Sequence, residues 1–252
     1  MPESATIRFY TLPPRKVEWP YLLVNPKNYK ELFKRNFKHA ILDSGVEIFK
    51  DPKIRDYSKS FLRSWKYKAR NLTEILGDRL WVTIPDYPDD LAHQFGHKNV
   101  DKTLRNVEEF ITFDGVNWLV PLQSQYLNIF SFIESCQRTK ELLGNYPQIA
   151  IGTVCKTNNL RFIENCCKIA RRFFPKSHIH AFGVTLKALP RVKGVIDSWD
   201  SMAWCYPRKR FREWCKETGL KPFPNVQFGS REDDLEAFWK PYIERIMEIC
   251  KA

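Results

Sequence analysis

An apolar segment that starts at Gly194 ends in two aspartates, Asp197 and Asp200. Carboxylates at the end of a buried strand can act as acids, bases or nucleophiles, and nearby Lys and Arg side chains can hold phosphates. The pattern therefore indicates acid–base or nucleophilic chemistry beside a polyanion. The basic residues that follow the aspartates are Arg208, Lys209, Arg210 and Arg212.

Polar or small residues also end several other apolar segments of the chain. If the segments are parallel strands of a barrel, their ends meet on one face, where active sites lie. A single aspartate at a strand end is common because Asp starts turns and caps helices, but several on one face favour a functional site. Paired carboxylates suit cleavage of a bond at a sugar C1′, and a carboxylate with an amide suits the edge of a purine. These residues are Asp43, Asp86, Gln123, Gly152, Gly183 and Asp200.

Short segments rich in β-branched and aromatic residues alternate with helical patterns along the 252 residues. Eight such units predict a single (β/α)8 barrel domain over residues 1–252, with a doubly wound open sheet as the alternative. The link 183–194 is too short for a full crossover helix. We expect strands at 6–10 or 21–24 and at 39–43, 80–84, 118–122, 148–151, 178–182, 194–199 and 225–228. We expect helices at 28–37, 54–76, 101–110, 126–143, 159–174 and 233–250.

The composition is typical of a globular chain and favours an anionic partner, with a solvated basic surface as the alternative. Hydrophobic residues make up 43% of the chain, and the formal net charge is +12. This charge favours nucleic acid over a membrane as the partner. None of the seven cysteines forms a C-x-x-C pair, so we expect reduced thiols and no metal site. We expect no signal peptide and no membrane span, because no charged and apolar leader and no long apolar run is found.

Taken in chain order, these strand ends resemble the motifs of the tRNA-guanine transglycosylase superfamily. The resemblance covers nearly the whole chain and is clearest from Ile41 to Arg210. Segment 42–45 resembles D-S-G-G, segment 120–124 is similar to G-[IV]-V-Q-G, and segment 181–184 matches L-M-G-V-G. Segment 150–154 resembles the glycine segment that lines the base pocket, and segment 197–201 resembles D-[ML]-F-D-[CS].

The resemblance implies a role for each matched residue. It implies that Asp200 is the nucleophile and that Asp43 transfers protons. Asp86 and Gln123 would recognise the edge of the guanine. The resemblance also implies base contacts from Gly152, Thr153, Val154, Phe182 and Gly183, and supporting roles for Ser44, Gly45 and Asp197.

The chain also departs from the family pattern. Val46 replaces the second glycine of D-S-G-G, and Glu47 replaces an aromatic that stacks on the base, so Phe49 is the alternative stacking residue. The zinc motif C-x-C-x2-C and a C-terminal RNA-binding extension are not found. These departures favour the compact branch of the superfamily, whose members exchange guanine in DNA for a 7-deazaguanine.

We therefore expect a transglycosylase that exchanges guanine, in DNA rather than tRNA, for a 7-deazaguanine such as preQ0. The exchange would pass through a covalent glycosyl-aspartate without a cofactor or metal. Arg208, Lys209, Arg210 and Arg212 would hold phosphates, and Lys59–Arg70 would extend this track or form a solvated helix face. We expect a cytoplasmic protein of a prokaryotic or virus-infected cell, acting as a homodimer or with a partner subunit.

Three alternatives remain at this point. The first is a tRNA enzyme with a partner subunit, the second is a non-catalytic nucleic-acid-binding barrel, and the third is a metal-dependent barrel nuclease. His178 and His180 alternate along one segment, and we expect them on opposite faces as hydrogen-bonded core residues.

Overall fold

The computed structural model describes residues 7–51, 53–89, 98–205, 215, 219 and 231–251, without the side chains of residues 47, 50 and 231–236. Its strands are β1 (Arg8–Tyr10), β2 (Tyr21–Val24), β3 (His39–Leu42), β4 (Leu80–Thr83), β5 (Trp118–Leu122), β6 (Gln148–Ile151), β7 (His178–Ala181) and β8 (Ser198–Asp200).

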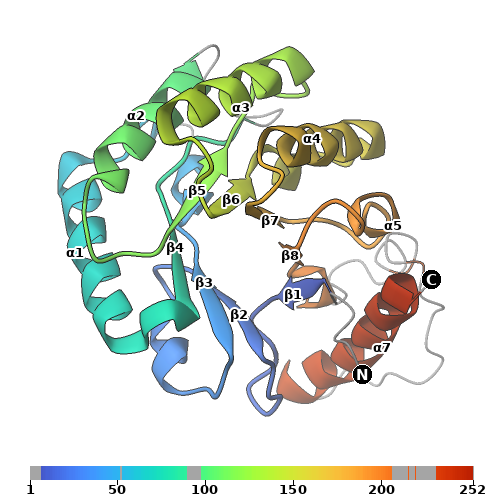
Figure 1. Cartoon of the computed structure of the whole chain (residues 1–252). Coiled ribbons are helices and arrows are strands. Elements are labelled where there is room, and N and C mark those ends of the chain that lie inside the picture. The colour runs from blue at the N-terminus through green and yellow to red at the C-terminus, as the bar shows by residue number, and fades with distance from the viewer. Residues whose placement is uncertain are drawn as a thin grey trace.

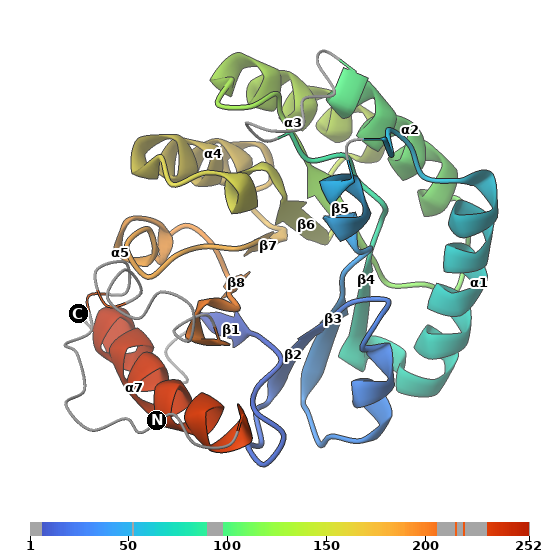
Figure 2. The ribbon, with the colours of Figure 1, turned by 180° about the vertical axis from the view of Figure 1, so that it is seen from behind.

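The eight strands form a closed parallel barrel, seen along its axis in Figures 1 and 2. The strand order is β1-β8-β7-β6-β5-β4-β3-β2, and all neighbours in this order are parallel. Thr11 closes the ring: its N–H donates to Tyr21 O at 3.2 Å and its carbonyl accepts from Leu23 N at 3.1 Å. This closure confirms the (β/α)8 barrel and excludes the open doubly wound sheet.

Two apolar layers stabilise the barrel. The lumen is filled by a small group of strand side chains that includes Tyr10, Ile41, Leu119 and Ala150, all fully buried. A much larger core lies between the outer face of the strands and the helices. The strands are therefore apolar on both faces, which is why they read as continuous hydrophobic runs in the sequence.

Helices follow most of the strands and surround the barrel. They are α1 (Lys59–Leu76), α2 (Lys98–Ile111), α3 (Ile129–Leu143), α4 (Leu160–Phe173), α5 (Leu189–Val192) and α7 (Arg231–Lys251), with short 3₁₀ turns η1 (Tyr29–Phe33), η2 (Val46–Lys50), η3 (Gly77–Arg79), η4 (Thr153–Lys156) and η5 (Ala203–Cys205).

Polar side chains define where several helices begin. Ser58, Asn128 and Asn159 precede α1, α3 and α4, and each accepts hydrogen bonds from backbone N–H groups of the first turn. Such caps satisfy donors that have no partner within the helix. The helix predicted over 54–76 therefore starts at Lys59, after its Ser58 cap.

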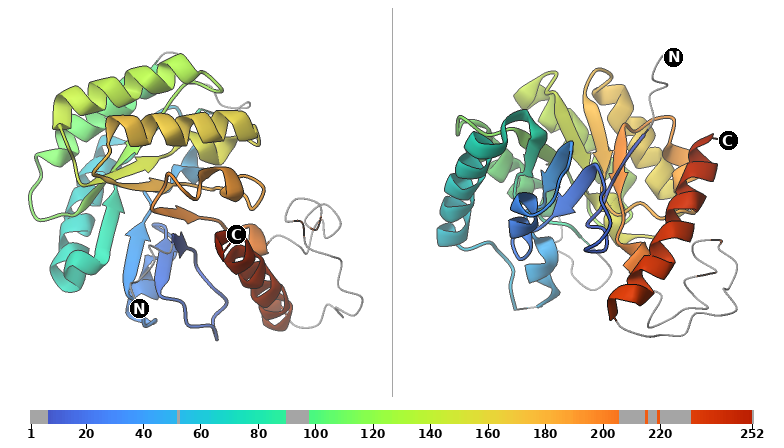
Figure 3. Two further views of the ribbon diagram at one scale, coloured as in Figure 1. Left: turned by 45° about the vertical axis from the view of Figure 1, so that its right-hand side comes forward. Right: turned by 90° about the horizontal axis from the view of Figure 1, so that it is seen from below.

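Helix α7 covers the outside of β1. The ring of Tyr242 lies 6.1 Å from that of Phe9, and Trp239 packs edge-on against Trp19 and Trp204 at 5.3 and 5.2 Å. Figure 3 shows α7, in red, beside the orange segment that carries η5. In the described part of the chain, no helix combines the length and the apolar character that crossing a bilayer demands.

Some of the predicted elements were wrong in detail. Residues 8–10 and 21–24 are both strands rather than alternatives, and these two complete the barrel of eight without the strand predicted over 225–228, which lies outside the described residues. The helix predicted over 28–37 is only the short turn η1. The strand predicted over 194–199 starts at Ser198, because Val195 and Ile196 still donate to Val192 O at the end of α5.

Candidate active site

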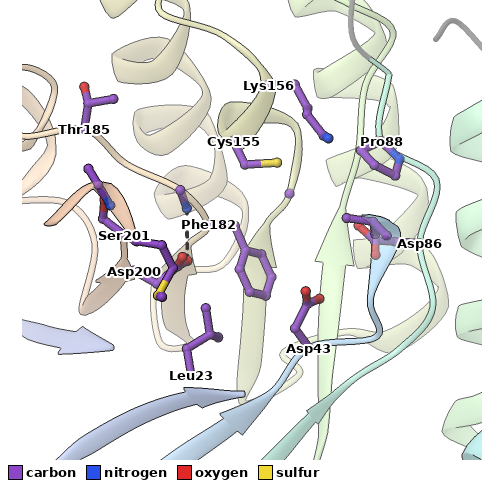
Figure 4. A pocket seen from close by; sticks show the side chains of 15 residues that line it. Leu23, Asp43, Asp86, Pro88, Cys155, Lys156, Phe182, Thr185, Asp200 and Ser201 are labelled. Atoms are coloured by element: carbon purple, nitrogen blue, oxygen red, sulfur yellow. Dashed lines mark hydrogen bonds between the residues drawn. The ribbon is translucent and has the colours of Figure 1, made fainter. Parts of the chain in front are cut away.

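A cavity of about 420 Å³ opens at the carboxyl ends of the strands, within the size range of small-molecule sites. Three carboxylates line it: Asp43 after β3, Asp86 after β4 and Asp200 at the end of β8 (Figure 4). The aromatic ring of Phe182 lies between Asp43 and Asp200. The other lining residues are Leu23, Val46, Pro88, Gly152, Cys155, Lys156, Gly183, Thr185, Ser201, Met202 and Ala203.

The carboxylate of Asp200 is held by two donors on one oxygen. The Gly183 N–H donates to its Oδ1 at 3.0 Å, and His180 Nε2 lies 3.2 Å from the same atom. Asp200 is only 6% exposed. The last residue of β8 thus presents a carboxylate whose Oδ1 is held in place before any ligand binds, as a preorganised nucleophile requires.

Asp43 follows β3 in a turn that its neighbours shape. The backbone N–H groups of Gly45 and Ser44 donate to its carboxylate, and Gly45 adopts a φ of +84°, which a side chain would strain. Burial, and then the charges of Asp86 and Asp200, raise the pKa of Asp43 to about 7. Near neutral pH this group can therefore both donate and accept a proton.

Asp86 is a buried acceptor with two hydrogen-bond donors. The Ser44 hydroxyl donates to its Oδ1 at 3.3 Å, and the Gln123 amide donates to its Oδ2. Burial raises the pKa of Asp86 to about 6, although both of these hydrogen bonds oppose the shift. Asp86 is thus ionised at neutral pH and faces the cavity, where it can accept hydrogen bonds from a ligand.

Gly152 at the end of β6 allows this arrangement. A Cβ at this position would lie 2.1 Å from Gln123 Nε2 and 3.1 Å from Asp86 Oδ2. Gln123 itself is fully buried and does not line the cavity, and no described residue hydrogen-bonds to its Oε1. The structure therefore places Gln123 behind Asp86, where it orients the carboxylate.

Gly183 serves a similar purpose in the turn after β7. Its φ is +65°, and a Cβ there would lie 2.7 Å from the Cβ of Cys155. This close approach turns the Gly183 N–H toward Asp200. Burial raises the pKa of the Cys155 thiol to about 12, so this cavity-lining cysteine stays protonated and is a poor nucleophile.

Several residues singled out in the sequence lie outside the cavity. Thr153 and Val154 are buried in η4, where the Thr153 hydroxyl is 2.8 Å from that of Ser124. Phe49 packs against Tyr57 and Tyr87 in a separate cluster, so Phe182 is the aromatic that lines the cavity.

Asp197 also lies away from the site. It precedes β8, three residues from Asp200 and so at the opposite end of that strand. Its Oδ2 accepts from the Arg171 guanidinium at 2.6 Å and from Ile179 N at 2.7 Å. Asp197 thus links Arg171 of α4 to the backbone of β7, at the end of the barrel opposite the cavity.

The expectation that His178 and His180 point to opposite faces was wrong. Side chains two positions apart on a strand share a face, and both imidazoles contact the Ser198 hydroxyl in the lumen. His180 also contacts Asp200. Because Phe182 comes two residues later and shares its face, the sequence could have predicted that His180 points toward the site.

The basic residues contribute little to the described cavity. Among the described residues, Lys156 is the one Lys or Arg that lines the cavity. In the track predicted over Lys59–Arg70, Lys66 pairs with Glu109 at 2.7 Å and Arg70 stacks on Phe113 at 3.9 Å. Arg208, Lys209, Arg210 and Arg212 lie outside the described residues. Within the described ranges, no group of three or more His, Cys, Asp or Glu side chains is arranged to hold a metal ion.

No protein-family model and no curated protein sequence matches the chain. Among solved structures, the carboxyl transferase domain of Rhizobium etli pyruvate carboxylase with pyruvate and biocytin superposes with a TM-score of 0.49 at 10% identity, over 96% of this chain and 48% of that one. The complete Rhizobium etli enzyme gives 0.48 at 10% identity, over 97% and 28%. A D-tagatose 3-epimerase-like protein gives 0.44 at 14% identity, over 92% and 91%.

These likenesses carry no argument about activity. The chain spans less than half of the pyruvate carboxylase chains that it matches, at identities where only a fold is shared. The function has to be argued from the cavity and its three carboxylates.

Proposed function

We propose that the protein is a transglycosylase that replaces a guanine in nucleic acid, with DNA favoured over tRNA, by a free 7-deazaguanine. The observation that carries the proposal is the convergence of three carboxylates in different environments on one cavity beside an aromatic ring. Their roles follow the resemblance to the tRNA-guanine transglycosylase superfamily. Asp200 is the nucleophile, Asp43 the proton carrier and Asp86 the acceptor for the base.

The first half of the reaction releases guanine. The target nucleotide leaves the stack and its base enters the cavity, over the ring of Phe182 and against Asp86. The free Oδ2 of Asp200 attacks C1′, and the C1′–N9 bond breaks with its electron pair on the base. The protonated carboxyl of Asp43 gives its proton to the departing guanine, which leaves a glycosyl ester on Asp200.

The second half reverses these steps with a different base. The 7-deazaguanine enters the same cavity and loses its N9 proton to the Asp43 carboxylate. Its N9 attacks C1′, and the C1′–Oδ2 bond breaks with its electron pair on Asp200. Two inversions at C1′ retain the original configuration. The pKa of Asp43, about 7, suits a group that must act as acid and then as base.

A base-exchange assay tests this proposal. Radiolabelled guanine or a 7-deazaguanine such as preQ0 is offered with duplex DNA, single-stranded DNA and tRNA. We expect label in DNA with the wild type and none with Asp200→Asn. Asp197→Asn, which changes an aspartate at the far end of the same strand, is the matched control and is expected to keep exchange.

The outcomes separate the alternatives. Label in tRNA alone would move the substrate to tRNA and support an enzyme with a partner subunit. Binding of nucleic acid without label in any polymer would contradict the transglycosylase and favour a non-catalytic barrel.

A further inference from the structure

A chain of hydrogen-bonding groups runs through the barrel lumen and ends on Asp200. His178 Nε2 lies 2.8 Å from Ser198 Oγ, and His180 Nδ1 lies 2.9 Å from the same oxygen. His180 Nε2 then lies 3.2 Å from Asp200 Oδ1. Both His180 and Ser198 are fully buried, so water cannot replace these contacts.

The positions of the protons follow from this geometry. The Ser198 hydroxyl has one proton and can donate to only one of the two imidazoles. If His180 were neutral with its proton on Nδ1, the bare Nε2 would face the Asp200 carboxylate and two lone pairs would oppose each other. His180 Nε2–H therefore donates to Asp200 Oδ1, and with a neutral His180 the Ser198 hydroxyl donates to its Nδ1 and accepts from His178 Nε2–H. Burial lowers the pKa of His178 to about 4, so that residue is neutral at the start of the chain.

Packing holds the His180 ring in this orientation. The ring of Tyr10 meets it edge-on at 5.5 Å, and the ring of Phe182 meets it at 4.7 Å with an interplanar angle of 79°. These two neighbouring aromatic rings restrict rotation about χ2. The donor on Asp200 is thus set by the barrel core rather than by a mobile loop.

The two donors leave one carboxylate oxygen for chemistry. The Gly183 N–H and His180 Nε2–H both donate to Oδ1. Among the described residues, no hydrogen bond reaches Oδ2. Asp200 lines the cavity, so its unbonded oxygen is the one that can attack.

We propose that His180 is a positioning residue that fixes the nucleophile Asp200 and stabilises it as a leaving group, an inference that rests on the proposed base exchange. When the C1′–Oδ2 bond breaks in the second half-reaction, the electron pair returns to the carboxylate. The charge spreads to Oδ1, where His180 and Gly183 already donate, as donors do in an oxyanion hole. In the first half-reaction the same donors orient Asp200. They also stabilise the negative charge that the carboxylate loses on attacking C1′, so they favour this step less.

Removing the donor should therefore slow the two half-reactions unequally. In His180→Ala, we expect transfer to the incoming 7-deazaguanine to slow roughly 10- to 100-fold, more than guanine release slows. The glycosyl-enzyme should accumulate as a result, while KM for the base changes little. His180→Gln, whose side-chain amide can donate to Oδ1, should recover part of the rate.

His39→Ala is the matched control. His39 is also buried in the lumen, where its Nδ1 bonds the Tyr10 hydroxyl at 2.9 Å and its ring packs on Trp81. His39 makes no hydrogen bond to Asp200. Its replacement should therefore lower the stability of the protein without changing the ratio of glycosyl-enzyme to free enzyme during turnover. Equal slowing of both half-reactions in His180→Ala, or the same change of ratio in His39→Ala, would overturn the inference.

A measurement on the free protein separates this inference from the proposed function. The ¹³C resonance of the Asp200 carboxyl is compared in the wild type, His180→Ala and His39→Ala. We expect it to move only in His180→Ala, because only there is a donor to Oδ1 lost. An unmoved resonance would contradict the positioning role whether or not the wild type exchanges bases. If the wild type never exchanges a base, the proposed function is contradicted, but the positioning role of His180 is not.

Discussion

At the scale of single residues, the site depends on how three aspartates are made to differ. Burial and the charges of Asp86 and Asp200 raise the pKa of Asp43. Hydrogen bonds from Gln123 and Ser44 keep the pKa of Asp86 nearer to the ordinary value of an aspartate. Environments that separate the pKa values of neighbouring carboxyls are typical of sites where one is the acid and the other the acceptor.

The raised pKa of Asp43 predicts a dependence of stability on pH. The folded state holds this proton up to about pH 7, whereas the unfolded chain loses it near pH 3.8. The unfolded state binds fewer protons in this window, so the free energy of unfolding falls as pH rises from about 4 to about 7, by up to about 4 kcal/mol. Asp43→Asn cannot ionise and should lack this loss.

Urea unfolding at pH 4.5 and pH 8 measures the effect. Asp43→Asn should gain stability relative to the wild type at pH 8 and gain much less at pH 4.5. Asp78→Asn, at an exposed aspartate of η3, is the control. A difference between Asp43→Asn and wild type that is equal at both pH values would contradict the raised pKa.

The same two groups predict the pH profile of guanine release. Release requires a protonated Asp43, which is lost above about pH 7, and an ionised Asp86, which forms above about pH 6. The single-turnover rate should therefore be bell-shaped with a maximum between these values, and the two limbs belong to the interacting pair. A rate that stays constant from pH 7 to pH 9 would rule out Asp43 as the acid.

At the scale of elements, the strand ends and the turns that follow them build the site. Gly183, in the turn after β7, has a φ of +65° and donates its N–H to Asp200. Gly183→Ala should cost about 1–2 kcal/mol in stability for the left-handed backbone and more for the contact with Cys155, and should lower the exchange rate.

Gly194→Ala is the matched control for this change. Apart from its chain neighbours, no described residue has an atom within 4 Å of a Cβ built on Gly194, and its φ is not in the left-handed region. Thermal unfolding should show a lower stability for Gly183→Ala than for Gly194→Ala. The exchange rate of Gly183→Ala should also be the lower of the two. Equal rates for both variants would show that the Gly183 turn does not position Asp200.

The sequence predicted most elements because each carries a strong local signal. The helices α3 and α4 differ from their predicted ranges by three residues or fewer at each end, and in the structure Asn128 and Asn159 cap them. The N-terminal strands were harder to predict, because Arg8–Tyr10 and Tyr21–Val24 are short and joined without a helix. Their parallel pairings with β8 and β3, and the Thr11 bridge between them, show that both belong to the barrel.

At the scale of the whole molecule, the barrel gathers residues that are distant in the sequence. Asp43, Asp86 and Asp200 were predictable as site residues, because each ends an apolar strand and such ends share one face. The places of Gln123 and Phe49 were not, since they depend on which neighbour each side chain meets. Gln123 bonds to Asp86, and Phe49 joins Tyr57 and Tyr87.

The formal net charge of +12 predicts that binding to DNA weakens with salt. If Arg208, Lys209, Arg210 and Arg212 each contact a phosphate, Kd should rise about 100-fold between 50 and 200 mM salt. Replacing all four by Ala should flatten the plot of log Kd against log salt. Lys66→Ala is the control, because Lys66 already pairs with Glu109. A slope unchanged by the fourfold variant would contradict phosphate contacts from this segment.

Mapping a covalent adduct tests the central claim most directly. The protein is mixed with the polymer that takes up label, quenched in acid, digested and analysed by mass spectrometry. We expect a peptide containing Asp200 that carries the sugar–phosphate chain without its guanine. The adduct should disappear when a 7-deazaguanine is added before the quench, and it should be absent from Asp200→Asn. Exchange without an adduct, or an adduct on another residue, would contradict Asp200 as the nucleophile.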